Sequence, residues 1–353
     1  MHDSIRNQSI QFQLDQHGYV VLTNFLTPEE CDELVEAGNE MAMNLPPKEE
    51  RYIFTSVNAE KQQLKDEYFI KSNDKISYFF EETALNETGD LKVDPTMSLN
   101  KIGHALHYLH PIFRCYTYSE RVKSVCRIFG VKEPAVVQSM YIFKNPGVGS
   151  EAQNDGNELR SDNSQTGAPL SPCSPYISQN LCTVPEDDTI TKRLQQLHFF
   201  SIDTYGLSVI PHQDITYLHT EPVPPLGFWI ALEDANVENS CLWFIRGSHK
   251  SGVHRRLIRN PNKNEPYSMV YNQPNAYYPE SSFVPVAAAK GTCILIHGNV
   301  VHRSAKNKSN MSRHAYTFHV IEKKNNNYSP ENWLQEGQNA PFENVYTTNQ
   351  NID

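Results

Sequence analysis

Two residues of the kind that bind metal ions stand one apart in the stretch VIPHQDITYLHTEP, residues 209–222: His212 and Asp214. On a β-strand, side chains two positions apart point to the same face, so this imidazole and this carboxylate can reach one metal ion. A histidine from a distant strand would complete a set of two histidines and one carboxylate. Such a set leaves coordination positions open and is typical of non-haem Fe(II) oxygenases. A His-x-Asp pair alone is a weak signal, and most such pairs bind no metal.

The third ligand is expected in the downstream stretch ILIHGNVVHRSAKNKSNMSRHAYTFH, which offers His297 and His302. His302 is preferred, because Ser304 follows it and can help to bind a carboxylate, whereas His297 is interpreted as a strand or turn histidine. Arg313 lies eleven residues beyond His302. If a hairpin joins the two strands, Arg313 returns to the same interior, where a guanidinium requires an anion such as a dicarboxylate co-substrate. Four other histidines are interpreted as structural or solvated: His249, His254, His314 and His319.

Short strands must position these side chains. The region 209–322 contains several segments of strand-forming residues separated by turns: LGFWIALEDA, SCLWFIRGSH, FVPVAAAKGTCILIHGNVVHRS and SRHAYTFHVIE. Lys290 and Gly291 are expected to form a turn between two strands. Because no alternation of strands with helices is visible, the sheet is predicted to be antiparallel. A double-stranded β-helix, or jelly roll, is the natural architecture, since it protects the sheet edges.

The N-terminal region is expected to add flanking helices to this mainly β fold. GYVVLTNFL, residues 18–26, predicts a strand, and TPEECDELVEAGNEM, residues 27–41, predicts a helix. Thr27 is its expected N-cap, with Pro28 at the first helical position and Glu30 completing a capping box. KIGHALHYLHPIF, residues 101–113, has apolar residues at helical spacing and predicts another helix.

Composition excludes several classes of protein. The 353-residue chain has a formal net charge of −10 and no long basic run, which argues against nucleic acid as a partner. No apolar run is long enough to span a bilayer, and the N-terminal residues lack the apolar core of a signal peptide. The seven cysteines are scattered, odd in number and form no CxxC pair, which indicates neither a disulfide framework nor a thiolate zinc site. We expect a cytoplasmic monomer.

One tract departs from this pattern. Residues 152–208 begin with AQNDGNELRSDNSQTGAPLSPCSPYISQN, which is rich in Ser, Asn, Gln, Gly and Pro and has almost no apolar periodicity. Such a composition cannot bury enough surface to offset the entropic cost of ordering. The sequence therefore predicts one domain over residues 10–347, interrupted by a disordered insert at 152–208.

At this point the sequence resembles a known family, the phytanoyl-CoA dioxygenases. The resemblance rests on GYVVL followed by FL and EE, on HQD, on CLWF followed by GSH, and on HGNVVHRS followed by SRHAYTFH. It covers residues 10 to 347 apart from 152–208. Two residues depart from the family pattern: Ser240 stands where glycine is usual, and Arg246 where proline is usual.

The resemblance implies a double-stranded β-helix enzyme that uses Fe(II), 2-oxoglutarate and O₂. By motif position, His212, Asp214 and His302 would bind iron, and Arg313 would pair with the distal carboxylate of 2-oxoglutarate. Three further residues match co-substrate positions of the family: Lys101, Met140 and Trp229. Without the resemblance, these three would be interpreted as a surface lysine at a helix start, a core methionine and a packed strand aromatic.

The resemblance further implies hydroxylation of a small-molecule or lipid-like substrate, coupled to decarboxylation of 2-oxoglutarate to succinate. The carboxylate of Asp214 matters to this expectation, because halogenating relatives lack it and leave its position to a halide. Two alternatives stay open. One is a metal-binding jelly roll with no oxygenase activity, in which Arg313 would have no evident purpose. The other is an inactive or regulatory splice form. The sequence does not identify the prime substrate.

Overall fold

A computed structural model describes the chain over five ranges: residues 2–54, 67–81, 83–146, 209–265 and 267–348. The predicted insert lies outside these described residues. None of the helices in the described ranges is long and apolar enough to cross a membrane.

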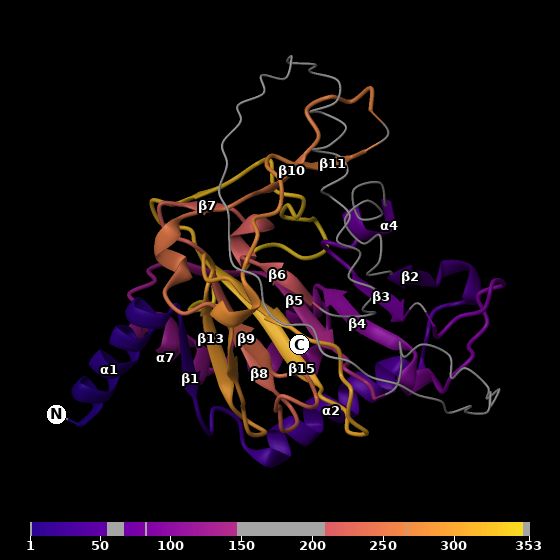
Figure 1. The fold of residues 1–353 in the computed structure, drawn as a ribbon, viewed down its shortest axis with the longest axis horizontal. Helices are drawn as coiled ribbons and strands as arrows, with labels where there is room; N and C mark the ends of the chain where they lie inside the picture. Colours follow the sequence, from indigo (N-terminus) through magenta and orange to yellow (C-terminus); the bar gives the residue numbers. More distant parts are fainter. Residues whose placement is uncertain (1, 55–66, 82, 147–208, 266, 349–353) are drawn as a thin grey trace, which may run out of the picture. The chain divides into compact units, whose positions relative to one another are not determined.

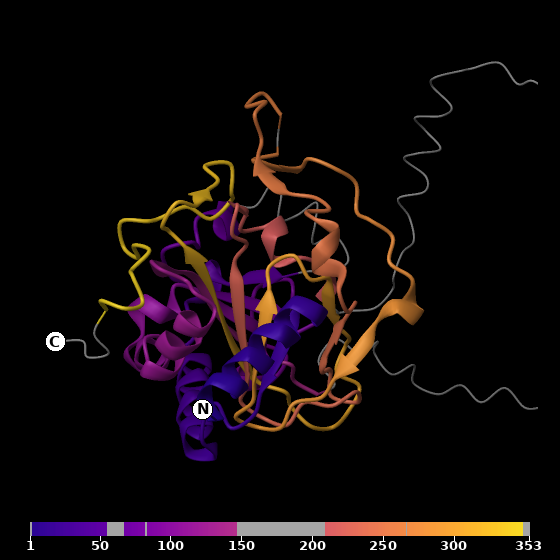
Figure 2. The ribbon, with the colours of Figure 1, turned by 90° about the vertical axis from the view of Figure 1, so that its left-hand side faces the viewer.

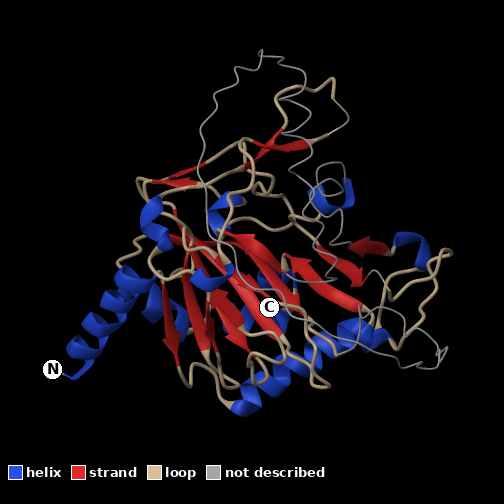
Figure 3. Cartoon of the chain, viewed as in Figure 1, coloured by secondary structure: helices blue, strands red, loops and turns tan. Residues whose placement is uncertain are grey.

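Two antiparallel sheets dominate the described residues (Figure 3). In spatial order, the larger sheet consists of β1 (Tyr19–Leu22), β13 (Cys293–His297), β8 (Leu226–Ala231), β15 (Ala315–Glu322), β5 (Pro134–Ile142), β4 (Leu99–His104), β3 (Ile76–Glu81) and β2 (Tyr52–Phe54). The smaller sheet consists of β12 (Val284–Val286), β9 (Leu242–Phe244), β14 (His302–Ser304) and β6 (Val209–His212). Among the described strands only β2 and β3 pair in parallel, so the predicted antiparallel arrangement is confirmed.

The two sheets pack face to face. Side chains of both belong to one buried apolar cluster, with Trp229 and Ile294 from the large sheet and Leu242 and Phe244 from the small sheet. Neighbouring strands of each sheet come from distant parts of the chain, as in the order β13-β8-β15-β5. This double-sheet arrangement is the double-stranded β-helix that the sequence predicted. Two short ribbons lie outside the sheets: β10 (Leu257–Arg259) with β11 (Met269–Tyr271), and β7 (Thr220–Glu221) with β16 (Asn327–Tyr328).

Helices from the N-terminal part cover the other face of the large sheet (Figure 2). The α-helices of the described residues are α1 (His2–His17), α2 (Pro28–Met43), α4 (Glu67–Ile70), α5 (Leu106–Leu109), α6 (Pro111–Thr117) and α7 (Glu120–Ile128). The short 3₁₀ helices are η1 (Lys48–Glu50), η2 (Pro95–Met97), η3 (Asp214–Thr216), η4 (Ser248–Ser251) and η5 (Glu280–Ser282). One apolar cluster joins Leu34 of α2 to Phe228 of β8 and Phe318 of β15. The large sheet is thus buried on both faces.

Helix α2 begins as its sequence predicts. Thr27 is the N-cap, Pro28 opens the helix and the reciprocal capping bonds with Glu30 are both present. The helix packs closely on the sheet at Gly38, where a Cβ atom would overlap the ring of Tyr141 on β5. This contact anchors the helical layer to the strand beside the central strand β15 (Figure 1).

Two element predictions were wrong in their extent. The strand expected over 18–26 ends at Leu22. The helix expected over 101–113 is instead strand β4 up to His104, followed by α5 and α6. Strand β4 lies between β3 and β5 and contributes Leu99 and Ile102 to the core below the sheet. A strand covered on both faces loses the simple alternation of apolar and polar residues, so its pattern can resemble that of a helix.

Candidate metal centre and co-substrate site

The first two candidate ligands stand at the end of an edge strand. Strand β6 closes at His212, Gln213 stays extended, and Asp214 opens the 3₁₀ helix η3. The expectation that both ligands lie on one strand was therefore wrong for Asp214, which lies two residues beyond the end of β6. Because Gln213 keeps an extended backbone, His212 and Asp214 still point to the same side.

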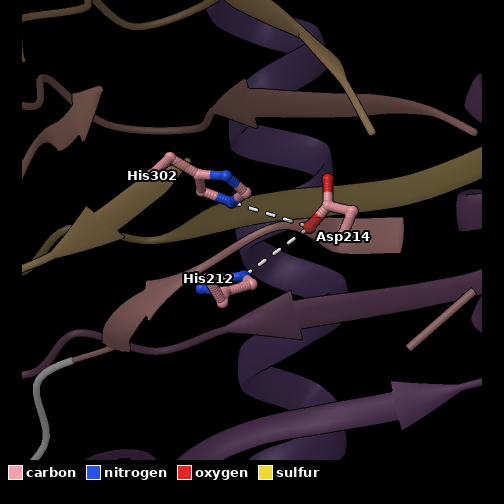
Figure 4. Close-up of side chains that lie close together, drawn as sticks. All are labelled: His212, Asp214 and His302. Atoms are coloured by element: carbon pink, nitrogen blue, oxygen red, sulfur yellow. Dashed lines mark ion pairs between the residues drawn. The ribbon is translucent and has the colours of Figure 1, made fainter. Parts of the chain in front are cut away.

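The third candidate comes from the neighbouring strand. His302 on β14 is the direct cross-strand partner of His212 on β6. Nε2 of each histidine lies 3.6 Å from Oδ1 of Asp214, and the three side chains point toward one another (Figure 4). Within the described residues, these three form the group whose ligand atoms lie within 4.8 Å of one another and could hold a metal ion.

Both imidazoles are oriented by backbone carbonyls. Nδ1 of His212 donates to the carbonyl of Ile210 over 2.9 Å, and Nδ1 of His302 donates to the carbonyl of Val300 over 3.1 Å. Each Nε2 then carries the lone pair that a metal needs. Burial lowers the pKa of His302 to about 4, so this imidazole is neutral at neutral pH. The donor set and its tautomers therefore suit a divalent transition metal.

Asp214 is held as a buried carboxylate. Burial works to raise its pKa, but His302, His319 and His212 outweigh that effect and keep the pKa of Asp214 well below its usual value. The preceding residue fixes the turn: the Gln213 amide donates to the carbonyls of Gly252 and Asn299 and accepts a bond from the backbone N–H of His254. The carboxylate thus stays ionised in a site that excludes most water.

Two other histidines differ in their relation to this centre. His297 lies apart from it, with its ring 4.9 Å from that of His249 and its Nδ1 accepting the backbone N–H of Asn299. His319 on β15 lies beside the centre instead, with Nε2 at 3.4 Å from Oδ2 of Asp214. The interpretation of His319 as an ordinary structural or solvated residue missed this position. No spacing in the sequence signals it, because β15 and η3 are far apart along the chain.

Arg313 is a buried cation with hydrogen-bonding capacity to spare. Its side chain is 1% exposed, and its Nη2 donates to Oγ of Ser304 over 3.2 Å. Nε and Nη1 have no hydrogen-bond partner among the described residues. Burial lowers the pKa of Arg313 to about 10, so the side chain remains charged at neutral pH. A buried guanidinium with two unused donors is a site for an anion.

Arg313 lies in the same interior as the metal ligands, as expected, but the hairpin that was expected to bring it there is wrong. Strands β14 and β15 do not form a hairpin, because β14 belongs to the small sheet and β15 to the large one. The chain crosses between the sheets, and Arg313 precedes β15 with its backbone N–H bonded to the carbonyl of Lys144. Its guanidinium carbon lies 5.2 Å from the centre of the Trp229 ring. The crossing brings Arg313 into the space between the sheets.

Ser304 links Arg313 to β14. Its hydroxyl donates to the carbonyl of Ser240 over 3.1 Å and accepts from Arg313, so its proton is used within the protein. Ser240 itself has a positive φ of 77°. That conformation favours glycine, which explains why the family pattern usually has a glycine at this position. At the other departure, Nε of Arg246 donates to the hydroxyl of Tyr19 over 3.1 Å.

The three further candidates lie near one another on the large sheet. Trp229 of β8 and Met140 of β5 are both direct partners of Thr317 on β15, so they share one row. Met140 also pairs with Gly103 of β4, two residues from Lys101. The row faces the small sheet, since Trp229 belongs to the cluster between the sheets. Lys101 is half-buried on a strand, so its interpretation as a surface residue at a helix start does not hold.

Lys101 and Lys144 add positive charge to this region. Burial lowers the pKa of Lys101 to about 8 and that of Lys144 to about 7. Nζ of Lys101 lies 5.0 Å from the centre of the Phe79 ring. Sequence reasoning missed Lys144, which lies two residues beyond the end of β5 and carries no motif signal.

Comparison with known proteins gives consistent results. The sequence profile of the family described as Phytanoyl-CoA dioxygenase (PhyH) matches residues 14–163 and 170–315. A zebrafish (Danio rerio) protein named phytanoyl-CoA dioxygenase domain-containing protein 1 is 38% identical over 98% of this chain and 100% of its own length. A phytanoyl-CoA dioxygenase from Arabidopsis thaliana is 34% identical over 92% of each chain.

Solved structures share the fold at low sequence identity. The non-heme alpha ketoglutarate dependent epimerase SnoN from nogalamycin biosynthesis has a TM-score of 0.53 and 11% identity, over 97% of this chain and 99% of its own. A second SnoN structure, in complex with Fe³⁺, alpha ketoglutarate and nogalamycin RO, has a TM-score of 0.52 and 12% identity over 96% and 99% of the two chains. Both likenesses concern the arrangement of the sheets.

Proposed function

The chain belongs to the phytanoyl-CoA dioxygenase family and is an oxidoreductase of the dioxygenase class, and on this premise we propose that it is an Fe(II)- and 2-oxoglutarate-dependent enzyme that hydroxylates a small-molecule or lipid-like substrate. The proposed iron ligands are His212, Asp214 and His302. The proposed anchors of 2-oxoglutarate are Lys101, Met140, Trp229, Ser304 and Arg313. We propose that the protein acts as a cytoplasmic monomer.

One observation carries this proposal: strand β14 contributes both to the three candidate metal ligands and to the buried site for an anion at Arg313. His302 and Ser304 are two residues apart on β14, so they share a face with a separation of about 7 Å. Nη2 of Arg313 contacts Ser304. A five-carbon dicarboxylate can therefore reach from the metal position to the guanidinium.

Each residue has a distinct part in this reaction. Fe(II) with 2-oxoglutarate and O₂ would supply an oxidant that takes hydrogen from a C–H bond, while 2-oxoglutarate is decarboxylated to succinate. The chain orients the two imidazoles through the carbonyls of Ile210 and Val300. The Arg313 fork would bind the distal carboxylate, with Ser304 fixing the fork. Asp214, His302 and Arg313 are all buried, which would limit the access of water to the reaction.

Arg313 favours this proposal over a jelly roll that binds metal without oxygenase activity. Such a protein would need the three metal ligands but not a buried guanidinium with two unused donors. Burying an unpaired charge costs stability, so a structural role gives it no physical reason. An inactive or regulatory form is tested by turnover alone.

The test is turnover of 2-oxoglutarate to succinate by the purified protein with added Fe(II), without a prime substrate. We expect slow turnover in the wild-type protein and none in His212→Ala or Asp214→Ala, because two ligands hold iron poorly. The matched control is His297→Ala, which removes a histidine outside the donor set and should leave turnover unchanged. Equal turnover in all four proteins would refute the iron assignment.

A further inference from the structure

We propose that His319 is a positioning residue that holds the Asp214 carboxylate in one orientation, so that a single oxygen of it is offered to the metal position. The inference rests on the proposed function and adds to it a residue outside the three ligands. A histidine at this place would keep the ligand set open enough for a co-substrate and O₂.

The two oxygens of Asp214 have different surroundings. Oδ1 lies 3.6 Å from Nε2 of both His212 and His302, so it points to the place where three ligand atoms converge. Oδ2 is turned away, has no hydrogen bond that meets ordinary geometry among the described residues, and lies 3.4 Å from Nε2 of His319. A carboxylate that used both oxygens on the metal would take up a further coordination position. The contact with His319 opposes that rotation.

The backbone makes room for this contact. His319 on β15 is the direct cross-strand partner of Gly227 on β8. A Cβ atom on Gly227 would lie 3.1 Å from Oδ2 of Asp214 and 3.5 Å from Cδ2 of His319. The first distance is tighter than an ordinary contact, so a side chain there would push against the carboxylate. The missing side chain lets Asp214 lie over β8 and reach His319.

A purely structural role does not explain the choice of histidine. His319 is 6% exposed, and its Nδ1 has no hydrogen-bond partner among the described residues. Burying an imidazole with an unpaired nitrogen costs stability relative to an apolar side chain, and the contact with Asp214 is its compensating interaction. Residues that orient a metal ligand in this way commonly set metal affinity.

The experiment measures Ni(II) binding to the full chain by calorimetry, with Ni(II) as a redox-stable probe. His319→Leu, of similar volume but without a donor, is expected to weaken Ni(II) binding by about 10- to 100-fold. His319→Gln places an amide N–H near the position of Nε2 and should restore most of the affinity. His319→Asn is equally polar but too short, and should bind as weakly as His319→Leu.

Two comparisons make the outcomes separable. If His319→Leu does not fold, the comparison of His319→Gln with His319→Asn still tests the role of His319. Equal Ni(II) affinity in these two variants and in the wild-type protein would overturn the inference. His302→Ala serves as the reference for a lost ligand. If His302→Ala loses Ni(II) binding while the His319 variants retain it, the inference fails and the proposed metal centre stands. If the wild-type protein does not bind Ni(II) at all, the proposed function fails with it.

Discussion

Replacing Arg313 with lysine should weaken 2-oxoglutarate binding without loosening the metal. The guanidinium is buried, keeps Nε and Nη1 without partners among the described residues, and donates Nη2 to Ser304. Nη2 carries a second N–H group, which together with a parallel N–H of Nη1 or Nε can bind both oxygens of a carboxylate. A lysine retains the charge, but its ammonium is a point donor that cannot form the same fork.

The size of the effect follows from the bond that is lost. A hydrogen bond to a charged group contributes about 1.5–3 kcal/mol. Since about 1.4 kcal/mol corresponds to a factor of ten, the KM for 2-oxoglutarate should rise between about 10-fold and about 150-fold. The metal ligands are unchanged, so the affinity for the metal should remain within about twofold of wild type.

The assay follows succinate formation against 2-oxoglutarate concentration at saturating Fe(II), with direct titration of 2-oxoglutarate onto the Ni(II)-loaded protein as a check on KM. Arg303→Lys is the matched control, because Arg303 lies on the same strand as Ser304 but pairs with Glu280 at the surface. An unchanged KM in Arg313→Lys would refute the reasoning and move the anchor to Lys101, the next cation of the site.

Three further predictions concern other parts of the chain. Since burial lowers the pKa of Lys101 to about 8, the side chain loses its charge as pH rises through that value. The KM for 2-oxoglutarate should therefore rise several-fold from about pH 7 to about pH 9 in wild type, whereas Lys101→Met, measured in the same assay, should have a higher KM that changes less over this range, because only Lys144, with a pKa of about 7, then still loses charge there. Gly38→Ala would overlap the Tyr141 ring and should lower the free energy of unfolding by about 1–3 kcal/mol in denaturant titrations, with Glu36→Ala as an exposed control on the same helix. Removal of residues 152–208 should leave both succinate formation and the unfolding midpoint at least at the wild-type level, and a variant that fails to fold would contradict the prediction of an insert.

The site residues that could be predicted from the sequence are those that short sequence motifs mark. His212 and Asp214 stand out because their spacing alone places two ligands together. His302 and Arg313 could be singled out by the types of their neighbours, and the structure brings both to the space between the sheets. The hairpin invoked for Arg313 failed because strand pairing is decided by the whole sheet and not by the proximity of two segments in sequence.

What sequence patterns missed lies in contacts between distant strands. His319 reaches Asp214 only because β15 inserts beside β8 at Gly227. Lys144 is buried beneath the segment that leads to β15, since its Nζ donates to the carbonyl of Ala305 and its own carbonyl accepts from the side chain of Asn307. The segment at Lys101 resembled a helix because Ile102, Leu106 and Phe113, which all pack into one core, have the spacing of a helix face although Ile102 lies on a strand. In each case the burial that gives the residue its role is a property of the assembled sheets.

The position of β15 has a consequence for biosynthesis. This strand pairs with β8 on one side and β5 on the other, so the last long strand to leave the ribosome fills the middle of the large sheet. Until Glu322 has been synthesised, β5 and β8 each present an unpaired row of backbone donors and acceptors that can recruit other chains. A premature stop before Ala315 would leave both of these edges unpaired, and we expect such a product to aggregate more readily than the full chain.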